Sequence, residues 1–330
     1  MPDRPGALVV SLDFELHWGM RDHVGRNDPA FGRLLEARRA VVDLLALFTE
    51  RNIRATWATV GFLFASTRDE LEAHRPELRP TYARAELDPY SEQIGADEEH
   101  DPEHLAGSLV DRIAQSPGQE VGSHTFSHYY CLEAGQDEAT FRADLTAARA
   151  IARHKGLELT SLVLPRNQWN PRYAGTVHEM GFRCVRGPQR SWAHQARAGA
   201  ADSTLRRTAR LADTYAGVSP PPTTAWHDVV HPSGLSDVPA SAFLRPYVPS
   251  RSRLEPLRQA RVRAGLRHAA RQGRIFHLWW HPHNFSQHGP ENVAVLERVL
   301  DEFDGLAAAE GMQSLTMADV AAAAASRPRA

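Results

Sequence analysis

Two carboxylates lie at the end of an apolar stretch near the start of the chain. The run "ALVVSLDFE" at 7–15 is predicted to form a buried strand that ends in Asp13 and Glu15. Side chains two residues apart on a strand share a face, so both carboxylates point to the same side. Two like charges this close are costly to bury unless a cation or strong hydrogen-bond donors lie between them. The pair therefore predicts a bound cation or a group of donors at this strand end.

Two histidines with the spacing of metal ligands follow another predicted strand. The sequence "EVGSHTFSH" at 120–128 supplies His124 and His128. Imidazole is the commonest metal ligand, and four-residue spacing lets two rings meet one ion where the segment turns. An isolated pair of this kind is more often two hydrogen-bonded histidines. With a carboxylate from a separate strand end, however, it forms a set that leaves positions on an ion open for water and substrate.

The elements that must bring these groups together follow from alternating apolar runs and stretches of helical period, which is typical of parallel α/β units. Because ligands bind where the carboxyl ends of parallel strands converge, side chains that follow each strand are candidates for one site. The predicted strands are 7–15, 54–61, 119–124, 159–165, 182–187 and 275–281, and the predicted helices are 33–52, 101–115, 137–155, 172–181, 254–272 and 290–310. The later strand ends add Arg166, Asn167, Gln168, His281 and His283.

Two segments interrupt the alternation of strands and helices. Residues 66–100 are rich in charged side chains, and residues 194–253 contain proline-rich turns, which cannot hold a hydrogen-bonded ladder. We interpret both as insertions that wall one side of the site, with a solvated helical excursion as the second interpretation of 66–100. The 330 residues are predicted to form a single catalytic domain around them.

Composition excludes several classes of protein. The net charge of −2 gives no general attraction to nucleic acid or to an anionic membrane. No stretch approaches the ~18 apolar residues that a membrane-spanning helix needs. Cys131 and Cys184 are too few for a disulfide framework, and "MPDRPG" lacks the features of a signal peptide. We therefore expect a cytoplasmic protein without a nucleic-acid partner or a membrane span, and the oligomeric state stays open.

Four motifs carry a family resemblance. In their order and separation, "SLDFE", "HTFSH", "PRNQ" and "WWH" resemble the polysaccharide deacetylase family, also called the NodB-homology family or carbohydrate esterase family 4. The resemblance covers roughly 7–190 and 275–320. It implies an α/β fold, a distorted (β/α) barrel with the active site at the strand carboxyl ends. It also implies one divalent metal ion; we favour zinc, while cobalt, nickel and iron suit the same ligand set.

The resemblance also assigns the metal site. His124 and His128 match the metal-binding histidines of the family. The family usually has two adjacent aspartates in its first motif, whereas this chain has Asp13 and Glu15 with Phe14 between them. The implied division of roles gives Glu15 to the metal and makes Asp13 the general base.

Two further catalytic roles follow from the resemblance. Arg166 matches the arginine that pairs with the base, although Asn167 and Gln168 replace the proline and tyrosine that usually follow it. His281 matches the late-strand histidine that serves as general acid. The motif that holds this histidine through an aspartate and a tryptophan is only weakly echoed by "RGPQRSW" at 186–192.

Several side chains near the motifs are candidates for substrate binding. Trp18 and Tyr129 suit the apolar faces of sugar rings, or equally belong to the core. His283 either binds substrate or caps a loop, and we include Asn167 and Gln168 because they follow a strand. A backbone N–H near Tyr129 is expected to help hold the oxyanion of the tetrahedral intermediate.

Three functions fit these features. The favoured one is a metal-dependent N-deacetylase of an acetamido sugar in a cell-surface polysaccharide or its precursor. The second is a deformylase or another hydrolase of a non-glycan amide or ureide on the same metal site. The third is a non-catalytic glycan-binding module, which the presence of both Asp13 and His281 argues against.

Overall fold

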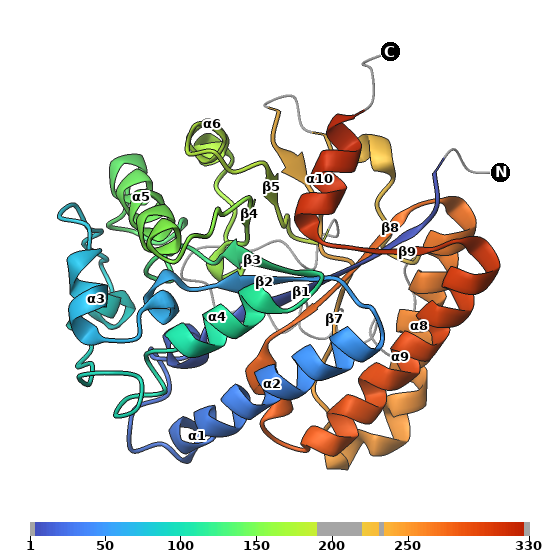
Figure 1. Cartoon of the computed structure of the whole chain (residues 1–330), viewed down its shortest axis with the longest axis horizontal. Helices are drawn as coiled ribbons and strands as arrows, with labels where there is room; N and C mark the ends of the chain where they lie inside the picture. Colours follow the sequence, from blue (N-terminus) through green and yellow to red (C-terminus); the bar gives the residue numbers. More distant parts are fainter. Residues whose placement is uncertain (1–3, 190–219, 231–233, 327–330) are drawn as a thin grey trace.

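A parallel sheet organises the part of the chain that the computed structural model describes, residues 4–189, 220–230 and 234–326. Its nine strands follow the order β6-β5-β4-β3-β2-β1-β8-β7, and β9 pairs with β1 beside β2 (Figure 1). The strands are β1 (Ala7–Phe14), β2 (Ala55–Thr59), β3 (Gln119–Ser123), β4 (Ser161–Leu162), β5 (Cys184–Val185), β6 (Ser236–Asp237), β7 (Ala242–Phe243), β8 (Ile275–Trp280) and β9 (Gln313–Leu315).

The two edges of this sheet are joined by one short segment. The N–H of Val238 donates to the carbonyl of Val185, the last residue of β5. The N–H of Ser241 donates to the carbonyl of His277 in β8. Residues 236–244 therefore bond to both ends of the strand order and curl the sheet toward closure. The predicted α/β fold, a distorted (β/α) barrel, is confirmed.

Strand register brings the predicted site residues to one rim. Phe14 of β1 lies opposite Thr59 of β2, and Thr59 lies opposite Ser123 of β3. The residues that follow, among them Glu15 and His124, therefore leave the sheet at the same level. On the other side of β1, Leu12 pairs with Trp280 of β8, which sets His281 level with Asp13. Residues from distant parts of the sequence thus meet because parallel strands end together.

Helices surround the sheet (Figure 1). Helix α2 forms because its apolar side chains recur every three or four residues and bury one stripe, from Leu34 to Phe48. Helix α10 closes the end of the barrel opposite the site, where its first N–H, on Met317, donates to the hydroxyl of Thr56. The helices are α1 (Pro29–Gly32), α2 (Leu34–Glu50), α3 (Arg68–Ala73), α4 (Gly107–Gln115), α5 (Glu138–His154), α6 (Ala174–Glu179), α8 (Glu255–Gln272), α9 (Gly289–Glu310) and α10 (Met317–Ala325).

The six predicted strands and six predicted helices are all present, with shifted ends. The strands expected at 159–165 and 182–187 keep only two paired residues each, and the helix expected at 101–115 begins at Gly107. None of the described helices is long and apolar enough to cross a membrane. Of the 194–253 insertion, 194–219 and 231–233 lie outside the described residues.

The 66–100 insertion packs against the loop that carries His128. It contains helix α3 and two 3-10 turns. The hydroxyl of Tyr82 accepts the N–H of Tyr130, and the buried Arg21 donates to the carbonyl of Glu86 at 2.7 Å. The insertion therefore supports a site loop from outside, and its effect on substrate access stays a prediction.

Candidate active site

Tight turns present the candidate residues at the rim of the barrel. Five of the non-glycine residues with positive φ adjoin or belong to the site: Leu16 (43°), Thr125 (65°), His128 (58°), Arg166 (55°) and Asn167 (51°). Left-handed backbone is costly for residues with a Cβ and persists where the surrounding structure imposes it. The strand ends therefore reverse sharply here, which aims the side chains at one another.

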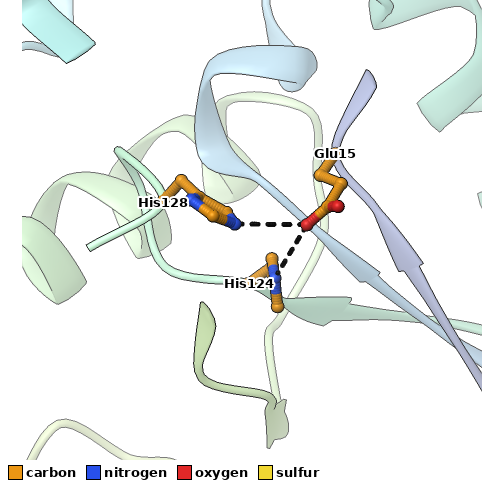
Figure 2. Close-up of side chains that lie close together, drawn as sticks. All are labelled: Glu15, His124 and His128. Carbon is orange, nitrogen blue, oxygen red and sulfur yellow. Dashed lines mark hydrogen bonds and ion pairs between the residues drawn. The ribbon is translucent and has the colours of Figure 1, made fainter. Parts of the chain in front are cut away.

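Glu15, His124 and His128 come together in a single buried group (Figure 2). The Oε2 atom of Glu15 lies 3.1 Å from Nε2 of His128 and 3.4 Å from Nε2 of His124. The three side chains are at most 6% exposed. The predicted metal ligands, from β1 and from the loop after β3, are thus adjacent in space.

Hydrogen bonds on the far side of each ring orient the two histidines. Nδ1 of His124 lies 2.9 Å from the carbonyl of Val163, so this nitrogen carries the proton and donates. The other ring nitrogen, Nε2, then faces the carboxylate of Glu15. Nδ1 of His128 lies 3.1 Å from the hydroxyl of Tyr130, which leaves its Nε2 facing the same oxygen.

This donor set fits a divalent cation. A lone pair on nitrogen and a carboxylate oxygen repel each other at these distances unless a positive charge lies between them. Burial lowers the pKa of His128 to about 4, so its ring is neutral near pH 7, the form that binds metals. Burial alone would raise the pKa of Glu15, but the imidazoles of His281, His124 and His128 around it outweigh burial and hold that pKa well below its usual value.

Gly19 sets the position of the Glu15 carboxylate. A Cβ at position 19 would lie 2.0 Å from Cδ of Glu15, so only glycine leaves room for the observed rotamer. We predict that Gly19→Ala displaces Glu15 and weakens metal binding by about 10–100-fold, measured by metal titration of the purified protein. Gly25→Ala is the matched control, because nothing lies within 4 Å of a Cβ there. Equal affinities in both variants would contradict this account.

Asp13 is held by Arg186, which corrects the predicted pairing with Arg166. Nη1 and Nη2 of Arg186 lie 2.6 and 2.7 Å from the two carboxylate oxygens of Asp13. Burial raises the pKa of Asp13, but the charge of Arg186 outweighs it and the net pKa is lowered. The Arg186 guanidinium also lies over the Trp279 ring, 4.2 Å from its centroid, and donates to Asn167.

Arg166 lies at the rim instead. Its Nη2 atom is 2.5 Å from Oδ2 of Asp22, and its guanidinium lies 4.7 Å from the centroid of the Tyr130 ring. The short turn Pro165–Asn167, with Arg166 in left-handed backbone, places this side chain beside the loop of His128 rather than over β1. The arginine of the motif, Arg166, is therefore present but does not contact Asp13. The arginine that pairs with Asp13 is Arg186, which follows the next strand, β5.

A signal in the sequence could have identified Arg186. It follows β5, within the predicted strand 182–187, and the same strand-end rule that selected Arg166 applies to it. The position of Arg186 is fixed by a series of hydrogen bonds between buried side chains. Nη1 donates to the Ser11 hydroxyl at 3.0 Å, and Ser11 lies 2.8 Å from Nε2 of His277. Nδ1 of His277 donates to the carbonyl of Val238, which holds the His277 ring in place.

His281 and His283 lie on the opposite side of Glu15 from His124 and His128. Nε2 of His281 is 3.5 Å from Oε1 of Glu15 and 3.9 Å from Oδ2 of Asp13. The His281 and His283 rings stack with centroids 4.7 Å apart, and Nδ1 of His283 is 4.0 Å from Glu15. Burial lowers the pKa of His283 to about 4. Both predicted residues therefore border the site.

Three of the predicted substrate-binding residues are buried in the scaffold. Trp18 is completely buried and donates from Nε1 to the carbonyl of His104. The Tyr129 hydroxyl bonds with Thr140 inside the core, and Gln168 bridges the N–H of Leu132 and the carboxylate of Glu133. These contacts favour the core interpretation of Trp18 and Tyr129, and the roles of the three residues in substrate binding stay predictions.

The backbone N–H groups of Tyr129 and Tyr130 already donate hydrogen bonds within the protein. The N–H of Tyr129 donates to the hydroxyl of Thr125 at 2.7 Å, and that of Tyr130 donates to the hydroxyl of Tyr82. The expected oxyanion donor is therefore not free at either position. Of the predicted substrate-binding residues, Asn167 accepts a hydrogen bond from Arg186, and His283 lies beside Glu15.

Comparison with known proteins assigns this arrangement. Residues 35–185 match the model of the family described as polysaccharide deacetylase. The chain contains a polysaccharide deacetylase domain. Members of this family are hydrolases that act on amide C–N bonds. The matched range includes His124 and His128, while Asp13, Glu15 and His281, at the ends of β1 and β8, lie outside it.

Solved structures share the fold of the deacetylase domain. A candidate polysaccharide deacetylase from Mycobacterium smegmatis is 16% identical, with a TM-score of 0.57 over 100% of this chain and 99% of its own. Another from Pseudomonas aeruginosa PAO1 is 12% identical, with a TM-score of 0.56 over 96% of this chain and 89% of its own. A search of curated proteins finds no match.

Proposed function

We propose that this chain is a metal-dependent N-deacetylase that acts on an acetamido sugar of a cell-surface polysaccharide or of its precursor. The observation that supports this most directly is the buried group of Glu15, His124 and His128, with the ion pair of Asp13 and Arg186 beside it. The family match supports the reaction class. The choice of an acetamido sugar rests on the family resemblance.

Glu15, His124 and His128 would hold one divalent ion, for which zinc is our first choice. Such an ion supplies a Lewis acid that polarises the acyl oxygen and makes water acidic enough to react near neutral pH. The hydrogen bonds that the two rings form with the Val163 carbonyl and the Tyr130 hydroxyl fix their orientation, as the partners of metal-binding histidines usually do.

Asp13 is suited to accept a proton from the attacking water. Arg186 keeps its carboxylate ionised, and both oxygens are fixed by the two guanidinium contacts. The same charge makes Asp13 a weak base, so its contribution depends on position more than on basicity. Asn167, also held by Arg186, lies where it can contact the substrate.

His281 is suited to protonate the leaving amine. Its Nε2 atom approaches both carboxylates, so its ring faces the space in which the scissile bond must lie. The rings of Phe243, Trp279 and His283 hold it in this orientation. Base and acid thus approach from different strands, β1 and β8, as hydrolysis of an amide requires.

Metal removal and substrate panels test the proposal. We expect acetate release from at least one acetamido sugar, loss of more than about 90% of the rate after chelation, and recovery with added zinc, cobalt, nickel or iron. Acetate is measured with a coupled assay, and formamido sugars and ureides run in parallel. Turnover of those compounds alone would favour the non-glycan hydrolase. Binding of sugars without any chelator-sensitive turnover would contradict the enzyme and favour the binding module.

A further inference from the structure

A cavity of about 240 Å³ adjoins the site on the side of His283. Its wall comes from the loop after β1, the start of α2, residues 246–248 and the turn that follows β8. His283 lines this cavity and also lies 4.0 Å from Glu15, while Met20 lines it immediately after Gly19. Ligand clefts of about 300 Å³ and more hold drug-sized molecules, so this cavity suits one smaller group. We call it the Arg33 cavity.

The walls of the Arg33 cavity are fixed by one buried side chain. Asn292 is 2% exposed and lies in the first turn of α9. Its Nδ2 atom donates to the carbonyls of Asn284, Gln287 and His288, and its Oδ1 atom accepts the N–H of Tyr247 at 2.6 Å. One amide therefore joins the turn after β8 to residues 246–248, and the two walls are held at a set separation.

Arg33 gives this cavity a positive charge. It is the one Asp, Glu, Lys or Arg side chain among the lining residues, and it has no carboxylate partner in the described part of the chain. With the Gln287 amide oxygen turned toward it, Nη1 and Nε of Arg33 donate at 3.0 and 3.1 Å. Nη2 remains available to a ligand. A guanidinium held in this way recognises carboxylate or phosphate oxygens.

We propose that the Arg33 cavity binds an anionic substituent, a carboxylate or a phosphate ester, carried by the acylated sugar. The inference rests on the proposed function, because the acyl group must lie at Glu15 when the substituent reaches past His283. The apolar Met20 and Leu34 and the ring of Tyr247 would contact the body of the sugar. The substrate class is then an acidic or phosphorylated acetamido sugar rather than a neutral one.

Binding to three related sugars tests this inference without requiring turnover. The probes are N-acetylglucosamine, N-acetylmuramic acid, which adds a lactyl carboxylate, and N-acetylglucosamine 6-phosphate. Calorimetric titration of the full chain should show about tenfold tighter binding of at least one anionic sugar, an effect that high salt weakens because Arg33 lies at the exposed rim. Comparing N-acetylmuramic acid with N-acetylglucosamine 6-phosphate distinguishes recognition of a carboxylate from recognition of a phosphate. Equal binding of all three sugars, or no binding, would overturn the proposal.

Arg33→Gln should remove the preference and leave the affinity for N-acetylglucosamine unchanged. Arg39→Gln is the matched control, since Arg39 is an exposed residue of the same helix, paired with Glu36. A preference that persists in Arg33→Gln would overturn the inference. Acetate release, measured in the same samples, separates the two hypotheses. Binding through Arg33 without acetate release would contradict the proposed function and leave this inference standing.

Discussion

Replacing Arg186 with methionine is expected to lower the free energy of unfolding by about 3–5 kcal/mol and to remove nearly all turnover. The side chains of Arg186 and Asp13 are 0% and 5% exposed, so the variant leaves a carboxylate buried without its counter-charge. Asp13 would then gain a proton or draw in water, and neither state serves as a fixed base. Chemical denaturation and acetate release measure the two effects.

Arg166→Met is the control for Arg186→Met. Its partner Asp22 is partly buried, but the Arg166 side chain is 35% exposed, so we expect a stability loss of at most about 1 kcal/mol. The two variants therefore test which arginine serves the base. If Arg166→Met is the more damaging one for turnover, the family's pairing holds in solution and the arrangement described above is wrong.

A double-mutant cycle isolates the ion pair itself. Asp13→Asn removes the charge that Arg186 neutralises, so the stability cost of Arg186→Met should shrink in the Asp13→Asn background. Aspartate and asparagine side chains have nearly the same shape, so the substitution at position 13 introduces few new contacts. A cost that is the same in both backgrounds would assign the effect to the packing of Arg186 on Trp279 instead.

Glu15→Gln is expected to empty the metal site, whereas Asp13→Asn is expected to keep the ion and lose turnover. Glu15 is the carboxylate whose oxygen faces both histidine Nε2 atoms, while both oxygens of Asp13 are bonded to Arg186. Loss of a general base lowers rates by about 10²–10⁴-fold. Elemental analysis of purified protein and acetate release measure the two properties separately.

His124→Ala provides the reference for a site without metal. It removes one imidazole and should reduce metal content as far as Glu15→Gln does. A contrary outcome is specific: if Asp13→Asn empties the site and Glu15→Gln retains the ion, the roles of the two carboxylates must be exchanged. Equal metal contents in all variants would place the ion elsewhere.

The sequence predicted the fold because periodicity and apolar runs are local properties. Helices α2, α5 and α9 begin and end within four residues of their expected ends, since their buried stripes and caps lie inside each segment. The short strands β6, β7 and β9 were missed. They pair over two or three residues, and such short pairs are stabilised by their neighbours rather than by their own composition.

The sequence by itself determined which groups reach the rim of the barrel. Asp13, Glu15, His124, His128 and His281 each follow or end a strand, and parallel strands end together, so their convergence required only the strand pattern. The tertiary structure alone decided which of these groups are partners. Arg186 rather than Arg166 meets Asp13, and Trp18, Tyr129 and Gln168 turn inward, because side-chain direction depends on turns and packing between segments far apart in the chain.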